Sequence, residues 1–513
     1  MKTYITLLIL IGLNLSIQAQ QKTDWFNLSF VEGEIAGAEV NDALELIGDR
    51  PLETIIVAVI DDGVDINHED FEGKIWTNID EIPDNGLDDD ANGYIDDVHG
   101  WNFLGNPQGE NIKNETLELT RLYRAYSKRF ENREVESISK SEEKDYAKYL
   151  EYKEEFEAEL KAIEAQFSEY AQLASLYKGA QAFYFEEVGG DSFSAEKLES
   201  WNPESEDGEQ VRNFLLLAER EGLNEYLEDG SEYFETYLEY NLNPDFDPRP
   251  LVNEDELPIG YGNKMVWAED PSHGTHVAGI IAAVRSNDKG VDGIASNAVI
   301  MPLRAVPGGD ERDKDIALAI RYAVDNGAKI INMSFGKSYS PEVDLVYDAI
   351  KYAEKNDVLL VHAAGNDAAD NDDMINYPDG TLGRKKSAKN FLTVAATGVE
   401  PNALFLAEFS NYGKKSVDIV APGVEINSLA PGNKTKSQSG TSMAAPVVSG
   451  VAALIWGLNP DLSAKKLKRL LVKSANSLED LMVQTGDLEI PLSDVVRNPA
   501  LISAENAARQ MID

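Results

Sequence analysis

The chain has 513 residues, 43% of them hydrophobic and 9% aromatic, which is enough apolar material for a large folded core and excludes global disorder. Its formal net charge of -45 argues against binding to nucleic acid or to an anionic membrane, because phosphate groups would be repelled. The absence of cysteine excludes disulfide bonds, thiolate zinc sites and a cysteine nucleophile.

The N-terminal segment has the pattern of a secretory signal peptide. Lys2 precedes an apolar run at residues 5–13, and small and polar residues follow up to Ala19. Because this run is too short to span a bilayer, the pattern predicts export with cleavage near Ala19. A short membrane anchor is the alternative interpretation. No second membrane-spanning segment is expected.

The first predicted strand ends at Asp61. Residues 54–60 form a continuous, β-branched apolar run, which predicts a strand buried on both faces of a parallel sheet. Such a strand places Asp61 at its carboxyl end, the edge where open α/β sheets bind ligands. A carboxylate there is costly unless it is hydrogen-bonded, so Asp61 either orients a histidine or caps the next turn.

The acidic stretch at residues 84–97 predicts a calcium site. Carboxylate and amide side chains alternate there and a glycine follows, as at the start of a calcium-binding loop. The ligands in this interpretation are Asp88, Asp90, Asn92, the carbonyl oxygen of Tyr94, and Asp96. The twelfth position is His99 and not a bidentate glutamate, which favours a static site over a regulatory EF-hand. A solvated acidic turn is the alternative.

Residues 114–241 are rich in Glu, Lys, Tyr, Leu and Ala and predict an all-α insertion. Apolar side chains recur at three-and-four spacing between residues 149 and 177, which predicts one long helix. Residues 119–130 could pair with it as a helical hairpin, and shorter helices are expected at 210–240. The insertion would bury its apolar stripe against itself, the rest of the chain or a partner. Coiled-coil dimerisation therefore remains open.

His273 stands in the first turn of a second predicted buried helix. A general base must come from a short list, because the chain has only five histidines: His68, His99, His273, His276 and His362. We expect His273 to be that base, since its setting is the most constrained. A zinc site on His273 and His276 is the alternative, but neither a cysteine nor a helical glutamate motif supports it.

From residue 294 onward, predicted strands and helices alternate. Strands are expected at 299–303, 329–334, 358–364, 391–396 and 417–420, and helices at 315–326, 341–355 and 464–474. This alternation predicts a doubly wound, mostly parallel α/β sheet. The third of these strands runs into Asn366, whose side-chain amide either donates to an oxyanion or serves a turn.

Ser442 lies among small residues directly before an apolar run at 447–456. We expect it at the N-terminus of a buried helix, where unpaired N–H groups and the helix dipole favour a developing oxyanion. Gly440 would let a substrate approach the backbone closely. A serine hydroxyl needs a base to become a good nucleophile. The alternative role for Ser442 is a helix N-cap.

Four segments together resemble the subtilisin-type serine proteases (subtilases, peptidase family S8). Residues 57–65, 273–279, 363–366 and 440–446 match sequence blocks of that family, and the second and last blocks are highly specific. The order Asp, His, Ser along the chain is also the subtilisin order. The resemblance covers about residues 50–105 and 255–475, so the helical insertion lies outside it.

The resemblance implies a subtilisin-like fold and a secreted serine endopeptidase. Ser442 would attack the peptide carbonyl to form an acyl-enzyme, while His273 transfers the proton and Asp61 holds the imidazole. Asn366 and the Ser442 N–H would form the oxyanion hole. The cleft would be lined by residues that pair with the substrate backbone, namely Ser334, Phe335 and Gly336.

The expected domain organisation follows from the resemblance and the composition. It comprises a signal peptide (1–19), two parts of a peptidase S8 domain (20–110 and 251–480), the helical insertion (111–250) and a C-terminal extension (481–513). We expect export to the periplasm or the exterior, a structural Ca²⁺ ion, and protein or peptide substrates. Oligomeric state, primary-pocket specificity and the natural substrate are left open.

Three departures from the family pattern stand out. Asp62 replaces a small residue beside Asp61, and the stretch before the first strand is too short for the usual folded pro-domain. The third departure is the insertion itself, which we expect to restrict substrate access or to assist folding. A binding protein on a degenerate protease scaffold is the rival interpretation. A lipase or esterase fits less well, because position 444 is alanine and His273 precedes Ser442.

Overall fold

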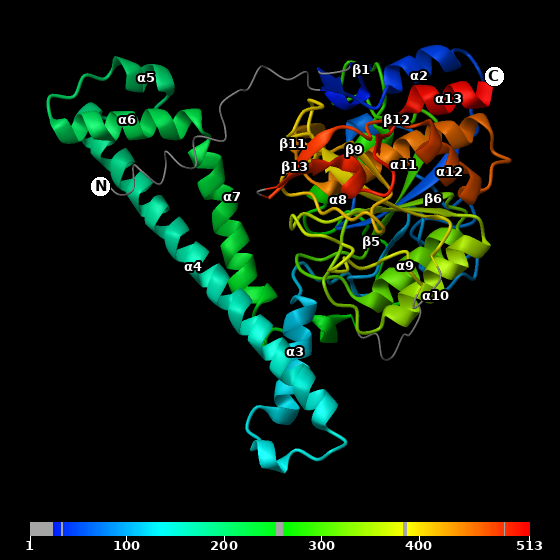
Figure 1. Ribbon diagram of the computed structural model, residues 1–513, viewed down its shortest axis with the longest axis horizontal. Coiled ribbons are helices and arrows are strands. Elements are labelled where there is room, and N and C mark those ends of the chain that lie inside the picture. Colours follow the sequence, from blue (N-terminus) through cyan, green and yellow to red (C-terminus); the bar gives the residue numbers. More distant parts are fainter. Residues whose placement is uncertain (1–23, 32–33, 253–259, 383–386, 487, 513) are drawn as a thin grey trace. The chain divides into compact units, whose positions relative to one another are not determined.

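The computed structural model describes residues 24–31, 34–252, 260–382, 387–486 and 488–512. The predicted signal peptide, residues 1–19, lies outside the described residues. The chain divides into two compact units, which are described separately (Figure 1). The helical unit comprises residues 119–246, and the sheet unit comprises residues 22–118 and 247–513.

The sheet unit is built on a nine-stranded sheet with the strand order β12-β15-β9-β8-β7-β6-β3-β5-β4. All neighbouring strands are parallel except β12 and β15. The strands are β3 (Ile55–Asp61), β4 (Trp101–Asn102), β5 (Ala298–Arg304), β6 (Ile330–Met333), β7 (Leu359–Ala363), β8 (Phe391–Thr397), β9 (Ile419–Pro422), β12 (Asn476–Ser477) and β15 (Ala500–Leu501). The predicted doubly wound, mostly parallel α/β fold is confirmed.

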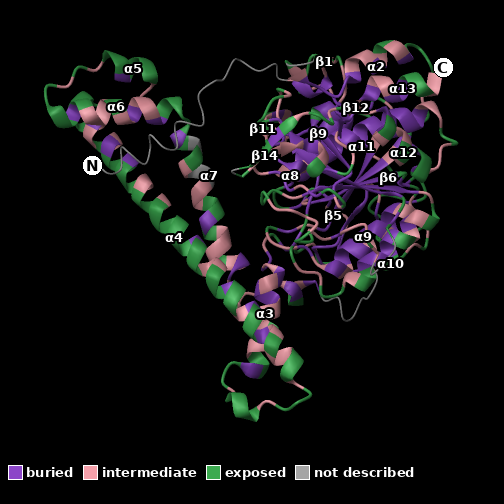
Figure 2. Cartoon of the chain, viewed as in Figure 1, coloured by how far each residue is buried: buried purple, intermediate pink, exposed green. Residues whose placement is uncertain are grey.

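Helices pack on both faces of this sheet (Figure 2). One face carries α8 (Ser272–Ala282), α11 (Thr441–Leu458) and α12 (Ala464–Ser474), and the other carries α9 (Asp313–Asp325) and α10 (Val343–Lys355). Alternate residues of β3 therefore enter different cores: Val57 and Val59 pack with α8 and α11, whereas Ala58 and Ile60 pack with α9 and α10. Burial on both faces explains why the sequence of β3 is continuously apolar.

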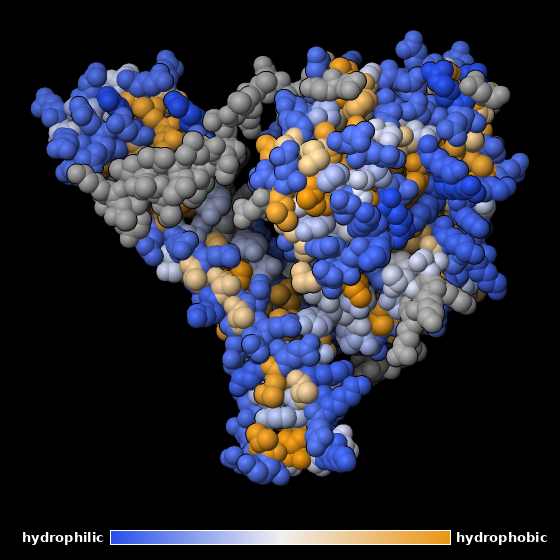
Figure 3. All heavy atoms as spheres, in the orientation of Figure 1, coloured by the Kyte–Doolittle hydropathy of each residue, from blue (hydrophilic) through white to orange (hydrophobic). Residues whose placement is uncertain are grey.

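Short elements complete the sheet unit. They are η1 (Trp25–Asn27), β1 (Phe30–Val31), β2 (Ile35–Ala36), α2 (Val40–Ile47), η2 (Glu69–Phe71), η5 (Arg249–Leu251), β10 (Ile426–Ala430), β11 (Lys434–Gln438), β13 (Met482–Thr485), β14 (Leu488–Pro491), η6 (Leu492–Asp494) and α13 (Ala504–Ile512). The stretch expected as a separate extension, 481–513, contributes β15 to the main sheet. Hydrophilic residues cover most of the face seen in Figure 3, as the net charge predicts.

The serine helix α11 corrects one expectation. By length and composition it is apolar enough to cross a membrane, although no second segment of that kind was predicted. In the structure 89% of its apolar window is buried among the sheet and its flanking helices. A helix that is buried on all sides must be apolar on all sides. Composition alone therefore does not distinguish such a helix from a membrane span.

The helical unit confirms the predicted hairpin. Its elements are α3 (Glu118–Phe130), η3 (Val135–Ser137), α4 (Glu143–Val188), α5 (Ala195–Ser200), α6 (Glu206–Arg220), α7 (Leu223–Thr236) and the π-helix η4 (Tyr237–Asn241). Tyr123 of α3 and Phe156 of α4 stack on each other, with their ring centroids 4.4 Å apart. A second cluster joins α4 to α5 and α6 around Tyr184, Leu198 and Leu215. The apolar stripe is thus buried largely within the unit itself.

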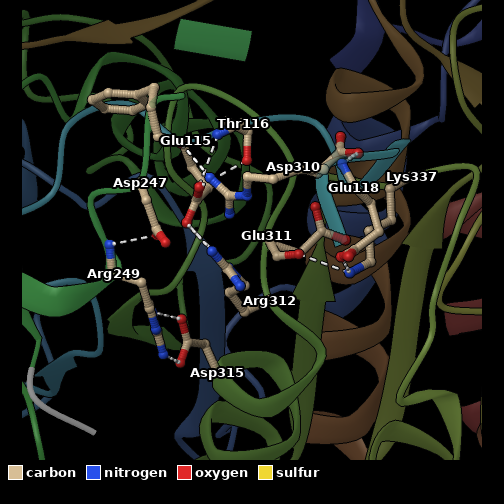
Figure 4. A network of polar contacts seen from close by, with 12 residues as sticks. Glu115, Thr116, Glu118, Asp247, Arg249, Asp310, Glu311, Arg312, Asp315 and Lys337 are labelled. Atoms are coloured by element: carbon tan, nitrogen blue, oxygen red, sulfur yellow. Dashed lines mark hydrogen bonds and ion pairs between the residues drawn. The ribbon is translucent and has the colours of Figure 1, made fainter. Parts of the chain in front are cut away.

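Buried ion pairs hold the two chain segments that flank the helical unit (Figure 4). Arg249 pairs with Asp315 through two contacts of 2.6 and 2.7 Å, and both side chains are almost fully buried. Glu118 pairs with Lys337 Nζ at 3.1 Å, and the same ammonium group lies 2.9 Å from Asp313. Removing one partner of such a buried pair costs about 3–5 kcal/mol. Both segments are therefore fixed to the N-terminal region of α9.

Candidate active site

Asp61 and His273 meet at the carboxyl edge of the sheet. Asp61 ends β3 and is buried, and His273 lies in the first turn of α8. Asp61 Oδ1 accepts hydrogen bonds from His273 Nδ1 at 2.7 Å and from the Asp62 N–H at 2.9 Å. With its proton on Nδ1, the imidazole keeps Nε2 as the basic nitrogen, and Nε2 has no hydrogen-bond partner within the described ranges.

Ser442 is the second residue of α11, next to a buried N-terminal turn. Its hydroxyl donates to the carbonyl oxygen of Ser334 at 3.1 Å. No hydrogen bond joins Ser442 to His273 in the part of the chain that the structure describes. Catalytic hydrogen bonds of this kind often form only when substrate binds, and a serine hydroxyl reorients by rotation about one bond.

Ser334 also compensates for a proline in the serine helix. Pro446 lies four residues after Ser442 and has no N–H, so the carbonyl oxygen of Ser442 lacks its usual helical donor. The hydroxyl of Ser334 donates to that oxygen at 2.9 Å, and Asn332 Nδ2 donates to the same hydroxyl at 2.9 Å. Sequence reasoning placed Ser334 in the substrate cleft but missed this contact. A proline four residues after Ser442 was the available signal.

Asn366 follows β7 and faces the start of the serine helix. Its Oδ1 accepts hydrogen bonds from the N–H and the hydroxyl of Thr441, each at 2.9 Å. Because the oxygen is occupied, the Nδ2 group is the one left to donate. A Cβ placed on Gly440 would lie 3.6 Å from this nitrogen, so Nδ2 lies close to the serine loop. An amide donor there can stabilise a developing oxyanion.

The three residues expected to line the cleft differ in exposure. Ser334 and Phe335 are buried, whereas Gly336 is exposed. The carbonyl oxygen of Phe335 is paired with His362 Nε2 at 2.8 Å. A backbone group of an exposed glycine is accessible to a peptide, so Gly336 is the member best placed to pair with one.

The remaining histidines of the core are paired with backbone carbonyl groups. His276 Nε2 lies 3.0 Å from the carbonyl oxygens of both Ile426 and Lys436. Burial lowers the pKa of His276 to about 4 and that of His362 to about 4. Both are therefore neutral side chains of the core, and His273 is the histidine with a carboxylate on one nitrogen.

Asp62 anchors the helix that carries His273. Its carboxylate accepts the backbone N–H groups of His273 at 3.0 Å and Gly274 at 2.7 Å, two unpaired donors of the first turn of α8. Burial and the neighbouring Asp61 charge raise the pKa of Asp62. Burial opposes protonation of His273, but the carboxylates of Asp61 and Asp62 outweigh it and raise the His273 pKa to about 9.

We expect the Asp62→Asn variant to be active at lower pH than the wild type. A general base must be neutral, so wild-type kcat/KM should rise as pH passes through the His273 pKa, about 9. Removing the Asp62 charge lowers that pKa and moves the acid limb down by about 1 pH unit. The measurement is kcat/KM against pH. The matched control is Glu269→Gln, an exposed carboxylate just before α8. An unchanged acid limb would contradict the assignment.

Carboxylates of the acidic loop accept backbone N–H groups of the loop itself, and the predicted calcium ligands remain a prediction. Asp88 accepts the N–H groups of Asn92 and Gly93, Asp96 accepts that of Asn85, and Tyr94 packs against Trp101 and Tyr322. Asp90 instead lies with Glu81 and Asp97, whose carboxylate oxygens come within 4.8 Å of one another. Glu81 precedes the predicted loop, and no local spacing pointed to it.

Comparison with known proteins identifies the family. The subtilase (peptidase S8) family model matches residues 226–488, which contain His273, Asn366 and Ser442. The chain is 38% identical over 233 residues to a cell wall-associated protease of Bacillus subtilis (strain 168), covering 45% of this chain and 24% of that protein. It is 38% identical over 226 residues to a thermophilic serine proteinase of Bacillus sp. (strain AK1). This match covers 43% of this chain and 50% of that protein.

A third relative is matched over more of its own length. Subtilisin BL of Lederbergia lenta is 39% identical over 208 residues, which cover 40% of this chain and 71% of that protein. The match thus covers 24% and 50% of the length of the first two relatives and 71% of the third. The chain belongs to the subtilase family of serine peptidases.

Proposed function

We propose that this protein is a serine endopeptidase that hydrolyses peptide bonds through an acyl-enzyme on Ser442. The observation that carries the proposal is the 2.7 Å contact between His273 Nδ1 and Asp61 Oδ1, which joins two residues 212 positions apart at the edge of the sheet that also holds Ser442. A buried carboxylate paired with a partly exposed imidazole is the arrangement that a general base requires.

In the proposed reaction, Ser442 Oγ attacks the carbonyl carbon of the scissile bond. His273 Nε2 takes the hydroxyl proton and passes it to the leaving amine, so that peptide cleavage releases the first product. Asp61 keeps the proton on Nδ1 and stabilises the imidazolium that forms. Water then attacks the acyl-enzyme with the same base, which returns Ser442 to its starting state.

The developing oxyanion would be held by Asn366 Nδ2 and the backbone N–H of Ser442. Support for this role comes from the hydrogen bonds of Thr441, which occupy Asn366 Oδ1 and leave the donor side of the amide. The N-terminus of α11 adds its dipole in the same place. We propose that a substrate peptide runs along Ser334, Phe335 and Gly336, with Gly336 supplying the accessible backbone groups.

We further propose export of the protein, with residues 1–19 removed and activity in the periplasm or outside the cell. The sequence pattern of the N-terminus supports this, and one relative carries the name cell wall-associated protease. Protein or peptide substrates follow from the proposed chemistry. A structural Ca²⁺ ion in the acidic loop completes the proposal, since carboxylate oxygens suit a hard cation.

A fluorophosphonate probe tests the proposed function. An active serine peptidase reacts with the probe at its nucleophile, and peptide mapping of the labelled protein should place the adduct on Ser442. Digestion of a peptide library by the same preparation should yield new amino termini. A folded protein that neither reacts with the probe nor cleaves the library would instead be a binding protein on a protease scaffold.

A further inference from the structure

The segment 334–336, along which we propose that a substrate peptide runs, lies outside the strands of the sheet. Strand β6 ends at Met333, directly before it. The backbone N–H and carbonyl groups of the exposed Gly336 have no hydrogen-bond partner among the described residues. Because no neighbouring strand holds this segment, its position depends on the residues that anchor its two ends. The upstream end is anchored by Ser334 and Phe335, whose carbonyl oxygens contact Ser442 and His362.

Lys337 follows Gly336 directly and anchors the downstream end. Its backbone N–H donates to the carbonyl oxygen of Tyr377 at 3.1 Å, and its own carbonyl oxygen accepts from the Tyr377 N–H at 2.9 Å. The lysine side chain turns into the protein and is only 2% exposed. A buried ammonium group is costly unless it is paired, so the partners of Lys337 help to decide where the segment lies.

The Lys337 ammonium group is held by three oxygen atoms (Figure 4). Glu118 Oε2 lies at 3.1 Å, the carbonyl oxygen of Glu311 at 2.7 Å and Asp313 Oδ1 at 2.9 Å. An ammonium group has three N–H donors, and these three oxygens lie within reach of them. Both carboxylates are buried, and charge-assisted hydrogen bonds of this kind are the stronger ones. Lys337 therefore cannot shift without weakening one of these contacts.

Glu118 is the first residue of α3, the helix that opens the insertion. Its backbone N–H donates to Asp310 Oδ2 at 2.7 Å. The chain just before it is also fastened, since Glu115 donates its N–H to the carbonyl oxygen of Gly308 at 3.2 Å and pairs with Arg312 at 2.8 Å. The start of α3 and the segment 334–336 are thus joined through the buried ammonium group of Lys337, although Glu118 and Lys337 are 219 positions apart.

We propose that Lys337 is a positioning residue for the substrate-binding segment, and that the Glu118 carboxylate at the start of the insertion helps to set its position. This inference rests on the proposed function, because the substrate path along residues 334–336 is part of that function. Lys337 acts through Gly336, whose free backbone groups would pair with the peptide. The insertion then influences peptide binding through its first residue, and a displacement of the start of α3 changes peptide affinity more than the reactivity of Ser442.

The Glu118→Gln variant of the full chain tests this role. Glutamine keeps the length of the side chain and an oxygen that accepts from Lys337, and Asp313 still balances the lysine charge. We expect KM for an extended chromogenic peptide to rise roughly 5- to 10-fold, the difference between a charged and a neutral hydrogen bond, with kcat nearly unchanged. The rate of labelling by a fluorophosphonate probe, which has no peptide backbone, should equal that of the wild type.

The matched control is Asp418→Asn. Asp418 is also a buried carboxylate paired with a lysine, Lys468, at 2.8 Å. It directly precedes β9 and so lies at the amino edge of the parallel sheet, opposite the edge that holds Asp61 and His273. This variant should keep the wild-type KM, kcat and labelling rate. Thermal unfolding shows whether each variant is folded.

Three results would overturn the positioning role. They are a wild-type KM in the folded Glu118→Gln protein, an equal rise of KM in Asp418→Asn, and a labelling rate that falls as much as peptide cleavage does. Should Glu118→Gln not fold, Glu118→Asp makes the same test, because it keeps the charge but shortens the reach toward Lys337. Failure of the proposed function gives a different result, since the wild-type protein itself would then neither react with the probe nor cleave the peptide.

Discussion

Replacing Ser442 with alanine is expected to abolish fluorophosphonate labelling and to lower kcat about 10⁶-fold, the size of the loss measured for the nucleophile of a subtilisin. The variant keeps the proposed oxyanion donors and the proposed substrate cleft, so KM should change little. The measurement is hydrolysis of a chromogenic peptide together with labelling by the probe. Folding is not at risk, because among the described residues the Ser442 hydroxyl makes a single hydrogen bond, to the carbonyl oxygen of Ser334.

The matched control for this variant is Ser437→Ala. Ser437 lies on β11, only five residues before the proposed nucleophile, and its side chain is exposed. It should retain wild-type kcat and labelling. A Ser442→Ala protein that keeps more than about 1% of wild-type kcat would contradict the nucleophile, since the remaining groups alone give only a ~10³- to 10⁴-fold acceleration over water.

Replacing Asn366 with alanine is expected to lower kcat ~100- to 1,000-fold with little change in KM, a loss that has itself been measured for an oxyanion-hole asparagine of a subtilisin. The reason is that the donor interacts with the oxyanion, which exists only in the transition state and the intermediate. Steady-state kinetics on the same chromogenic peptide provide the measurement.

The Asn366→Asp variant separates the donor from the structural role of this side chain. Aspartate keeps an oxygen that can accept from Thr441, as Asn366 Oδ1 does, but it replaces the Nδ2 donor with a second acceptor. We expect it to be at least as impaired as Asn366→Ala. Wild-type kcat in Asn366→Asp would show that only the contact to Thr441 matters. Asn356→Ala, an exposed asparagine after α10, serves as the unaffected control.

The anchoring of His273 by Asp62 connects the fold to the proposed chemistry. Gly274 lies so close to the first loop that an added Cβ would approach the carbonyl oxygen of Gly63 to 2.1 Å. The two N–H groups at the start of α8 can therefore reach the Asp62 carboxylate without a side chain in between. Asp61 is the main cause of the raised His273 pKa, and the Asp62 carboxylate that fixes the helix adds to it, so Asp62 contributes to both the position and the proton affinity of the imidazole.

The sequence by itself determined the features that depend on local patterns. A doubly buried strand is continuously apolar and ends in Asp61, and the small residues around Ser442 precede an apolar helix, so both could be recognised within a few residues. The alternation of strands and helices after residue 294 fixed the parallel sheet for the same reason. The long stripe of α4 predicted the helical hairpin, because side chains three and four apart share one helix face.

Only the tertiary structure decided the features that join distant positions. Two-residue strands such as β12 and β15 are too short to show a periodicity in the sequence. An apolar helix of the length of α11 can be a core helix or a membrane span, and only its surroundings in the structure distinguish the two. The hydrogen bond from Ser334 to the carbonyl oxygen of Ser442 and the close approach of the Glu81 and Asp97 carboxylates both depend on folding, because such neighbours are set by distance in space and not along the chain.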